Sequence, residues 1–243
     1  MSPVSLRTEM VERRLRRWLR ETPADALEAA DPFTGVQRVL VLAPHFDDEV
    51  IACGGAVLAH SRRGQHVRVV YLTDGSASEG EVSGAALSAL RREEAGRSAA
   101  LLGIAEQRYL DQPDGGLAVT DEVVAAVRAE VAQSDLVYAP HAEDAHPDHQ
   151  ATYQILQAAL AGLDVRPAVL YYEFWRPLRP NFAVDVSAVM GVKERALAEH
   201  RSQLQYLDYV RLMKALQAER GALLGVAYAE AYRLSPAVRS GGG

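Results

Sequence analysis

The chain contains 243 residues, of which 49% are hydrophobic and 24% are charged. This composition is ordinary for a soluble globular protein and excludes a chain that is mainly disordered. The formal net charge of −6 excludes the strongly basic surface that binds nucleic acid or an anionic membrane. The single cysteine, Cys53, excludes an internal disulfide and a cysteine-rich metal site.

Residues 1–30 are predicted to form an amphipathic helical extension, because apolar residues recur at helical spacing among several arginines. We expect this helix to pack on the domain or on a second subunit of a homo-oligomer. Glu9, Glu12 and Glu21 dilute the positive charge that a membrane-surface or transit segment needs. Neither a signal peptide nor a bilayer-spanning apolar run is evident, so we expect a cytoplasmic protein without an integral membrane segment.

Residues 31–243 are predicted to form a single domain in which strands alternate with helices. The unbroken apolar run 39–43 is typical of a strand buried on both faces, and a helix follows at 49–63. Further strands are predicted at 67–72, 107–110, 135–139, 169–174 and 182–186. Further helices are predicted at 85–102, 121–133 (capped by Asp121), 149–163, 191–203 and 208–223. This alternation predicts an α/β fold, a Rossmann-like three-layer α/β/α sandwich with a mainly parallel sheet.

Two polar motifs follow predicted strands. Pro44-His45-Phe46-Asp47-Asp48-Glu49 comes directly after the strand at 39–43, and His146-Pro147-Asp148-His149 comes shortly after the strand at 135–139. In open α/β sheets, ligands bind at the carboxyl ends of the parallel strands. We therefore expect the two motifs to converge on one crevice.

The composition of the motifs is that of a metal site. A catalytic zinc typically keeps three protein ligands from imidazole and carboxylate groups, together with a water. The remaining acids and imidazoles can serve as general base, as general acid or as support for the ligands. Of the adjacent Asp47 and Asp48, one can bind the metal while the other faces the water. Each motif alone also fits a plainer interpretation, in which its acids cap a helix or line a polar loop.

The sequence resembles the PIG-L/LmbE-like family of metal-dependent N-deacetylases over roughly residue 37 to the C-terminal region. Its first motif, His45-Phe46-Asp47-Asp48-Glu49, differs from the family pattern by Phe46 in place of proline, and His146-Pro147-Asp148-His149 matches the second motif without change. Weaker matches lie elsewhere in the chain: Gly54-Gly55, Thr73-Asp74-Gly75, Arg91 to Gly103, Asp111 to Gly115, and Lys193 to Gln203.

The resemblance implies a zinc ion held by three ligands, His45, Asp48 and His149. It implies that Asp47 is the general base and that His146 stabilises negative charge and acts as general acid. Asp148 is then expected to orient His146 and to support its charge. Imidazole and carboxylate ligands also permit Fe²⁺ or Co²⁺ as substitutes for Zn²⁺.

Five further residues are candidates for contact with substrate. Phe46 can add an aromatic wall, Asp74 can bind a substrate hydroxyl from its strand-end loop, and Arg91 and Arg92 can reach the substrate from the helix at 85–102. His141 is a candidate because it lies only five residues before His146.

The function implied is removal of an acetyl group from an N-acetylated amino sugar or glycoconjugate. One alternative is an amidase of the same fold that cleaves a bulkier amide, such as a thiol conjugate or an N-acylated antibiotic precursor. A second alternative is a non-catalytic, metal-stabilised carbohydrate-binding protein, although a purely structural site needs no spare base such as Asp47. A third is an iron oxygenase with two histidines and one carboxylate as ligands.

Overall fold

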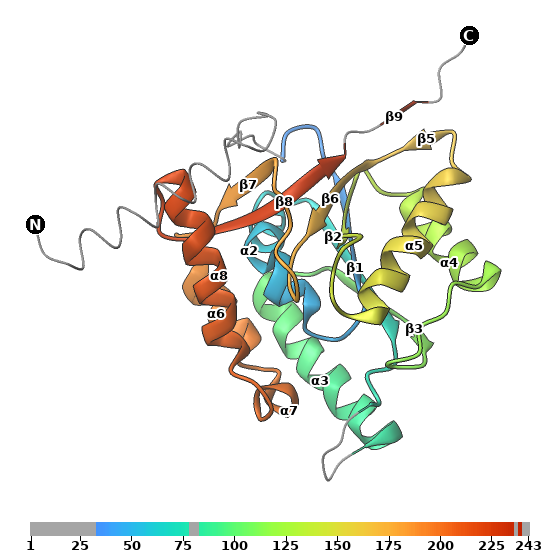
Figure 1. Cartoon of the computed structure of the whole chain (residues 1–243), viewed down its shortest axis with the longest axis horizontal. Helices are drawn as coiled ribbons and strands as arrows, with labels where there is room; N and C mark the ends of the chain where they lie inside the picture. The colour runs from blue at the N-terminus through green and yellow to red at the C-terminus, as the bar shows by residue number, and fades with distance from the viewer. Residues whose placement is uncertain (1–32, 78–82, 236–237, 240–243) are drawn as a thin grey trace, which may run out of the picture.

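The computed structural model describes residues 33–77, 83–235 and 238–239 (Figure 1). The predicted helical extension at 1–30 lies outside these residues. Seven strands form the main sheet: β1 (Arg38–Ala43), β2 (His66–Thr73), β3 (Glu106–Gln112), β4 (Leu136–Pro140), β6 (Ala168–Tyr172), β7 (Phe182–Asp185) and β8 (Ala229–Ser235). Two short strands, β5 (Val165–Arg166) and β9 (Val238–Arg239), pair separately.

The main sheet has the order β3-β2-β1-β4-β6-β8-β7. Its first five strands are parallel, whereas β8 runs antiparallel to both β6 and β7. The chain builds outward from β1 first through β2 and β3 and then, on the other side, through β4 and β6. The boundary between β1 and β4 is therefore the point at which the strand order reverses, where ligands bind in such sheets.

Helices cover both faces of the sheet (Figure 1). One layer contains α4 (Asp121–Val131) and α5 (Pro147–Ala161), and the other contains α2 (Asp48–Arg62), α3 (Gly84–Leu102), α6 (Met190–Leu197) and α8 (Tyr209–Leu224), with the short α7 (Arg201–Leu204) beside α3. Strand β1 serves both layers, because Leu40 and Leu42 enter the core with α4 and α5, and Val39 and Val41 enter the core with α2. The predicted three-layer α/β sandwich is thus confirmed.

The structure differs from the prediction in several local details, among them the short strands β5 and β9, which were not predicted. Strand β8 was not predicted, and the helix predicted at 191–203 is broken between α6 and α7. Helix α5 begins at Pro147 rather than at residue 149, because proline is well suited to the first turn. The cap of α4 is Thr120, whose hydroxyl accepts from the amide of Val123, and Asp121 lies in the first turn instead.

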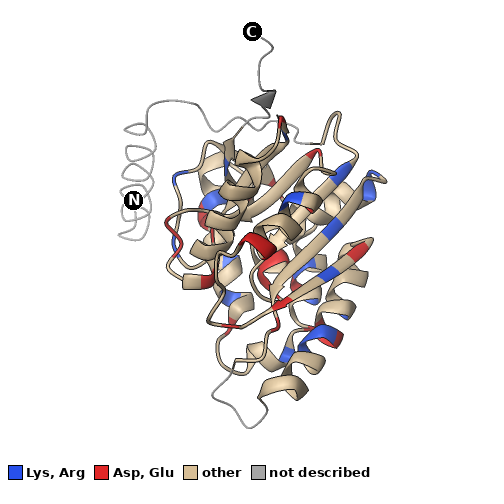
Figure 2. Ribbon diagram, turned by 90° about the vertical axis from the view of Figure 1, so that its right-hand side faces the viewer, with Lys and Arg blue, Asp and Glu red and all other residues tan. Residues whose placement is uncertain are grey.

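Acidic and basic residues are interspersed along the strands and helices (Figure 2). No helix in the described part of the chain combines the length and the hydropathy of a membrane span.

Helix α2, which begins at Asp48, is kinked at Cys53, whose φ of −138° is not helical. A buried ion pair satisfies the backbone groups that the kink frees. Lys193 Nζ donates to the carbonyl of Ile51, and Glu230 accepts from the amides of Gly55 and Ala56. Lys193 and Glu230 also contact each other at 2.5 Å. A side chain at Gly55 has no room, because its Cβ would lie 2.4 Å from Val186.

Replacing Lys193 by Met is expected to lower the free energy of unfolding by about 3–5 kcal/mol, because it leaves the Glu230 carboxylate buried without its partner. In the double variant Lys193→Met/Glu230→Gln, part of this loss is recovered, since no unpaired charge remains and the amide oxygen still accepts a backbone hydrogen bond. Urea unfolding of the parent, the two single variants and the double variant measures the coupling. If the loss of unfolding free energy in the double variant equalled the sum of the losses in the two single variants, this role for the pair would be contradicted.

His200, which precedes α7, is fully buried, and neither of its ring nitrogens makes a hydrogen bond within the described residues. Burial lowers its pKa to about 3, and the positive charges of Arg97 and Arg91 add to the effect. Histidine in the unfolded chain titrates near pH 6.5. Between pH 6.5 and 3, His200 therefore binds a proton in the unfolded chain but not in the folded one. Stability is lost as the pH falls through this window.

We expect the free energy of unfolding to fall by about 2 kcal/mol between pH 7 and pH 5 through His200 alone. The variant His200→Gln removes the titrating group and keeps a similar size. Its pH dependence, measured by urea unfolding at both pH values, should be flatter than that of the parent by this amount. Equal slopes in the two proteins would show that His200 does not titrate as its burial implies.

Candidate metal centre and active site

The two sequence motifs meet at the boundary between β1 and β4. His45 lies in the loop after β1, and His146 and His149 lie at the start of α5, which follows β4. The loop after β1 is held by Thr73, whose hydroxyl donates to the carbonyl of Pro44. The predicted convergence of the motifs is therefore observed in the structure.

Three imidazoles lie together at this boundary. His45, His146 and His149 each offer one nitrogen, and these three nitrogens lie within 4.8 Å of one another. Potential ligand atoms of His45, Asp114 and Asp148 form a second group within the same limit. His45 is common to the two groups, which places it at the centre of the cluster.

Asp48 links two of the imidazoles. Its Oδ2 lies 3.3 Å from Nδ1 of His45 and accepts from the backbone amide of that residue at 2.8 Å. Its Oδ1 lies 3.2 Å from Nε2 of His149. The structure thus brings together the three residues for which the resemblance implies metal binding.

The buried polar atoms of the cluster fit a metal ion. His149 is fully buried, yet neither of its ring nitrogens makes a hydrogen bond of normal geometry, although they lie 3.2 Å from Asp48 and 3.4 Å from Asp144. Oδ2 of Asp144 is also buried without a hydrogen bond among the described residues. Buried polar atoms are rarely left in this state, and imidazole together with carboxylate is the donor set that divalent zinc takes.

The carboxylates of the cluster favour the protonated forms of its histidines. Burial favours the neutral form of His45, but Asp114, Asp148 and Asp48 outweigh it and hold the pKa of His45 well above its usual value. Burial acts in the same way on His149, where Asp48 and Asp144 nevertheless raise the pKa to about 9. A cation is therefore favoured between these carboxylates, and a metal ion would replace the protons in that role.

Asp47 is the N-cap residue of α2 and is 5% exposed. Burial and the negative charge of Asp48 raise its pKa to about 7. With the amide of Gln203 oriented so that its nitrogen faces the carboxylate, Nε2 lies 2.6 Å from Oδ2 of Asp47. Asp47 is thus a carboxylate held in place by a neutral donor from α7, with a pKa suited to proton transfer near neutral pH.

His146 is the N-cap of α5, and its Nδ1 accepts from the backbone amide of Asp148 at 3.2 Å. This hydrogen bond places the proton of the neutral imidazole on Nε2. Burial lowers the pKa of His146, and the neighbouring His45 and His149 lower it further. His146 is therefore a neutral hydrogen-bond donor beside the cluster.

The carboxylate of Asp148 does not orient His146 by a hydrogen bond, as the resemblance had implied, but its negative charge does favour the protonated form of that imidazole. The carboxylate lies 3.1 Å from Nε2 of His45 and accepts from the amides of Gly115 and Leu117. Only the backbone of Asp148 contacts His146, because the side chain points back from the first turn of α5 toward the loop after β3. Asp148 therefore orients His45.

Three residues beside the motifs complete the centre and were not predicted as site residues. Asp114 lies 3.3 Å from Nε2 of His45, and Asp144 lies 3.4 Å from Nδ1 of His149 while its other oxygen accepts from the amide of His146. Gln203 reaches Asp47, as described above. A signal for Asp144 was present in the sequence, since it is an acid only two residues before His146, after a buried strand.

Phe46 does not form a substrate wall, because it is fully buried and packs edge-on against Tyr71 and Tyr109. Its ring fills the space beside Gly75, where a Cβ would lie 2.8 Å from it. The aromatic residue that replaces proline thus fixes the loop after β1 from inside the core.

The other substrate candidates after β2 and on α3 have different surroundings. Arg91 is buried, donates to the carbonyl of Gly75 and lies 3.4 Å from Asp114, so it reaches the cluster through that carboxylate. Arg92 instead pairs with Asp111 and lies over the ring of Tyr109. Asp74 accepts from the amide of Ser76 within its own loop. Contact of Asp74 with substrate remains a prediction.

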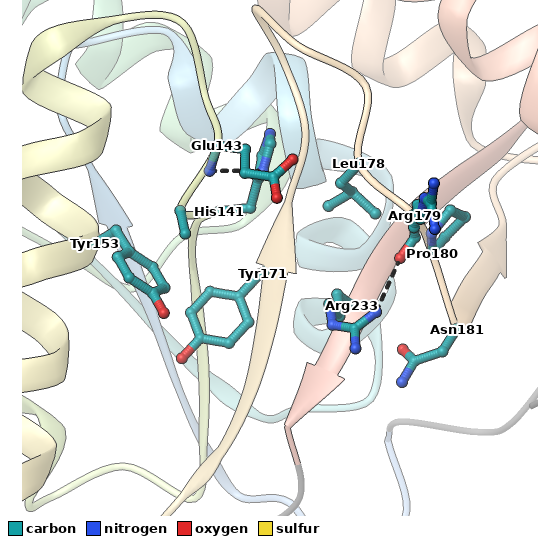
Figure 3. A pocket seen from close by; sticks show the side chains of 10 residues that line it. His141, Glu143, Tyr153, Tyr171, Leu178, Arg179, Pro180, Asn181 and Arg233 are labelled. Atoms are coloured by element: carbon teal, nitrogen blue, oxygen red, sulfur yellow. Dashed lines mark hydrogen bonds between the residues drawn. The ribbon is translucent and has the colours of Figure 1, made fainter. Parts of the chain in front are cut away.

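His141 lines a separate cavity of about 700 Å³ rather than the histidine cluster (Figure 3). Its Nε2 contacts the carbonyl of Arg176, and its Nδ1 accepts from the amide of Glu143. Tyr153 of α5, Tyr171 of β6, Arg233 of β8 and residues 178–181 of the loop before β7 also line this cavity. With both nitrogens engaged by the backbone, His141 joins two loops and does not take the predicted place in the active site.

The family described as GlcNAc-PI de-N-acetylase (PIG-L) matches residues 40–160. A diacetylchitobiose deacetylase of Thermococcus kodakarensis is 33% identical over an alignment of 232 positions that covers 86% of each chain. A 2'-N-acetylparomamine deacetylase of Streptomyces fradiae is 30% identical over 68% of this chain and 73% of its own length. The crystal structure of the N,N'-diacetylchitobiose deacetylase from Pyrococcus horikoshii is 30% identical, covers 93% of this chain and 92% of its own, and superposes with a TM-score of 0.74. The resemblance read from the two motifs is thus confirmed, and the chain belongs to the PIG-L family of deacetylases.

Proposed function

We propose that this protein is a zinc-dependent N-deacetylase that removes the acetyl group from an N-acetylated amino sugar or glycoconjugate. The observation that carries the proposal is that Asp48 lies 3.3 Å from His45 and 3.2 Å from His149, while the buried carboxylate of Asp47 precedes it in the chain. A metal-binding cluster with a spare base at its side is the arrangement needed for hydrolysis of an amide.

His45, Asp48 and His149 are the proposed zinc ligands. Asp48 contacts both histidines, and Asp144 and Asp148 hold the outer nitrogens of the two imidazoles. Such outer carboxylates orient a ligand imidazole and increase its basicity. Zinc held by these residues would supply a Lewis acid for the amide carbonyl and would lower the pKa of a water toward about 7.

Asp47 is the proposed general base. Its carboxylate accepts the proton of the attacking water, and the hydrogen bond from Gln203 holds the carboxylate in place. A base whose pKa is near 7 is about half ionised at neutral pH, so it can both take a proton from water and release it again.

His146 is the proposed oxyanion stabiliser and general acid. Its Nε2–H, fixed by the hydrogen bond at Nδ1, can donate to the amide oxygen as negative charge grows there. The nitrogen of the departing amine must gain a proton to leave. His146 can be the proposed general acid only as an imidazolium, which returns to its neutral form when it donates, and the proton that Asp47 takes from the water balances this step.

The substrate class is proposed from the relatives. Both relatives described above are deacetylases whose names specify N-acetylated amino sugars. An amidase for bulkier amides uses the same centre, and the described residues contain no feature that favours it.

The proposal is tested by incubating the zinc-loaded protein with a panel of N-acetylated glycosides and bulkier amides, and by following acetate and free amine. Acetate release from the glycosides supports the proposal. Binding without turnover would indicate the non-catalytic alternative, and turnover of the bulkier amides alone would indicate the amidase.

We propose further that residues 31–243 act as one catalytic unit and that the protein works in the cytoplasm. The single cysteine, which is buried and free, is consistent with a reducing compartment. Expression of residues 31–243 and cell fractionation test these two points.

A further inference from the structure

Two of the weaker sequence matches, Arg91 to Gly103 and Lys193 to Gln203, contact each other through one buried side chain. Glu94 lies on α3 and is 2% exposed. Its Oε1 accepts from the amide of Ser202 at 2.9 Å, and its Oε2 accepts from the hydroxyl of the same residue at 2.6 Å. Both oxygens of this carboxylate therefore bind a single residue of α7.

Helix α7 depends on contacts of this kind, because it spans only Arg201–Leu204. A helix so short is not stable by itself, and the first amides of any helix lack partners inside it. The residue before it, His200, makes no side-chain hydrogen bond to these amides. Glu94 supplies the acceptor from the neighbouring α3, and so fixes where α7 lies and how it is rotated about its axis.

The rotation of α7 matters because the residue after Ser202 is Gln203, whose Nε2 lies 2.6 Å from Oδ2 of Asp47. Successive residues of a helix point in directions about 100° apart. The rotation that directs Ser202 toward Glu94 therefore also sets the direction of Gln203. Ser202 and Gln203 are both buried, so α7 joins α3 to the proposed base inside the protein.

A second residue of α3 supports the other half of the centre. Arg91 is also buried and lies 3.4 Å from Asp114, which in turn lies 3.3 Å from His45. Arg91 and Glu94 lie on one face of α3, because residues three positions apart share a face of a helix. This face thus supports a proposed metal ligand through Asp114 and the proposed base through α7.

We propose that Glu94 is a positioning residue for the hydrolysis, which holds α7 so that the amide of Gln203 stays against the carboxylate of Asp47. Within the described part of the chain, the hydrogen bonds of the Glu94 carboxylate go to Ser202 alone. The inference rests on the proposed deacetylase function, because Glu94 acts on the reaction only through the base.

The test measures kcat, KM and zinc content in Glu94→Leu, which keeps a side chain of similar size but offers no acceptor to Ser202. The substrate is the N-acetylated glycoside of the panel above that the zinc-loaded parent hydrolyses fastest. We expect kcat to fall about 10–100-fold, the loss that a misplacement of about 1 Å can cause. KM should change less than about 3-fold and zinc content should stay parental, because neither substrate nor metal loses a contact.

Three further variants distinguish a lost acceptor from a damaged helix. Glu94→Gln keeps an acceptor for the Ser202 amide and places a donor beside the hydroxyl oxygen, so it should recover most of kcat. Glu93→Leu makes the same exchange at the exposed neighbouring position of α3 and should keep parental kcat and KM. Ser202→Ala removes one of the two hydrogen bonds and should lower kcat about 3–10-fold, which keeps the test decisive if Glu94→Leu does not fold.

The double variant Glu94→Leu/Gln203→Leu shows whether Glu94 acts through Gln203. If it does, the double variant has the same kcat as Gln203→Leu alone, whereas two independent losses multiply. Equal zinc content and an unfolding transition well above the assay temperature ensure that the compared samples are folded.

The outcomes separate the inference from the proposed function. Multiplied losses, parental kcat in Glu94→Leu or Ser202→Ala, a Glu94→Gln variant no more active than Glu94→Leu, or loss of zinc would each overturn the role of Glu94. Each of these results would leave the deacetylase intact. No acetate release from any glycoside by the zinc-loaded parent would overturn the proposed function itself, and the inference with it.

Discussion

Asp47→Asn is expected to lower kcat about 10²–10⁴-fold, the usual contribution of a positioned general base. Asparagine keeps the size of the side chain and an acceptor oxygen for the amide of Gln203, but it cannot take a proton from water. KM should change little, because the carboxylate acts on the chemical step. Steady-state kinetics together with the zinc content per chain measure both effects.

A matched control for this variant is Asp185→Asn, which makes the same exchange at an exposed position on β7 and should keep parental kcat. Full kcat in Asp47→Asn with full zinc content would remove Asp47 from the mechanism. Loss of zinc from the Asp47→Asn variant would instead identify Asp47 as a zinc ligand.

His149→Ala is expected to abolish zinc binding and activity together. The imidazole is fully buried between Asp48 and Asp144, so its removal leaves two carboxylates facing each other without the group that separates them. His66→Ala, at an exposed position on β2, should keep both zinc and turnover. Metal analysis by mass spectrometry, run beside an acetate assay, gives the two values for each variant.

His146→Ala distinguishes the two ways in which the histidine cluster can hold a metal. If the ligands are His45, Asp48 and His149, this variant keeps zinc and loses kcat. If all three imidazoles bind the metal, the variant loses zinc as well, which would contradict the oxyanion role proposed for His146.

The convergence of the two motifs was predictable because a buried strand precedes each of them. The apolar runs that became β1 and β4 have the length and composition of parallel strands, and the carboxyl ends of such strands lie on the same edge of a sheet. The positions of His45, Asp47 and His149 follow from this topology and from the resemblance to the PIG-L family, without knowledge of any side-chain contact.

The partners of these residues could not be predicted, because side-chain directions in loops depend on contacts distant in sequence. Asp148 orients His45, 103 positions earlier in the chain, rather than its near neighbour His146. Gln203 reaches Asp47 only because the helix predicted at 191–203 breaks before α7.

Strand β8 was missed for the same reason, because its place and its side chains depend on contacts distant in sequence. Strand β8 lies between β6 and β7 in the sheet although it follows both in the chain. Its Glu230 points into the core to satisfy the kink of α2, so a charged residue interrupts the apolar pattern by which strands are recognised.

The most direct test of a metal-dependent deacetylase is acetate release from the panel of N-acetylated glycosides by one preparation in three states: zinc-loaded, chelator-treated and reloaded with zinc. We predict release in the first state, loss of release together with loss of bound zinc in the second, and recovery in the third. Release that continues at the same rate after the zinc has been removed, or no release in any of the three states, would contradict the account.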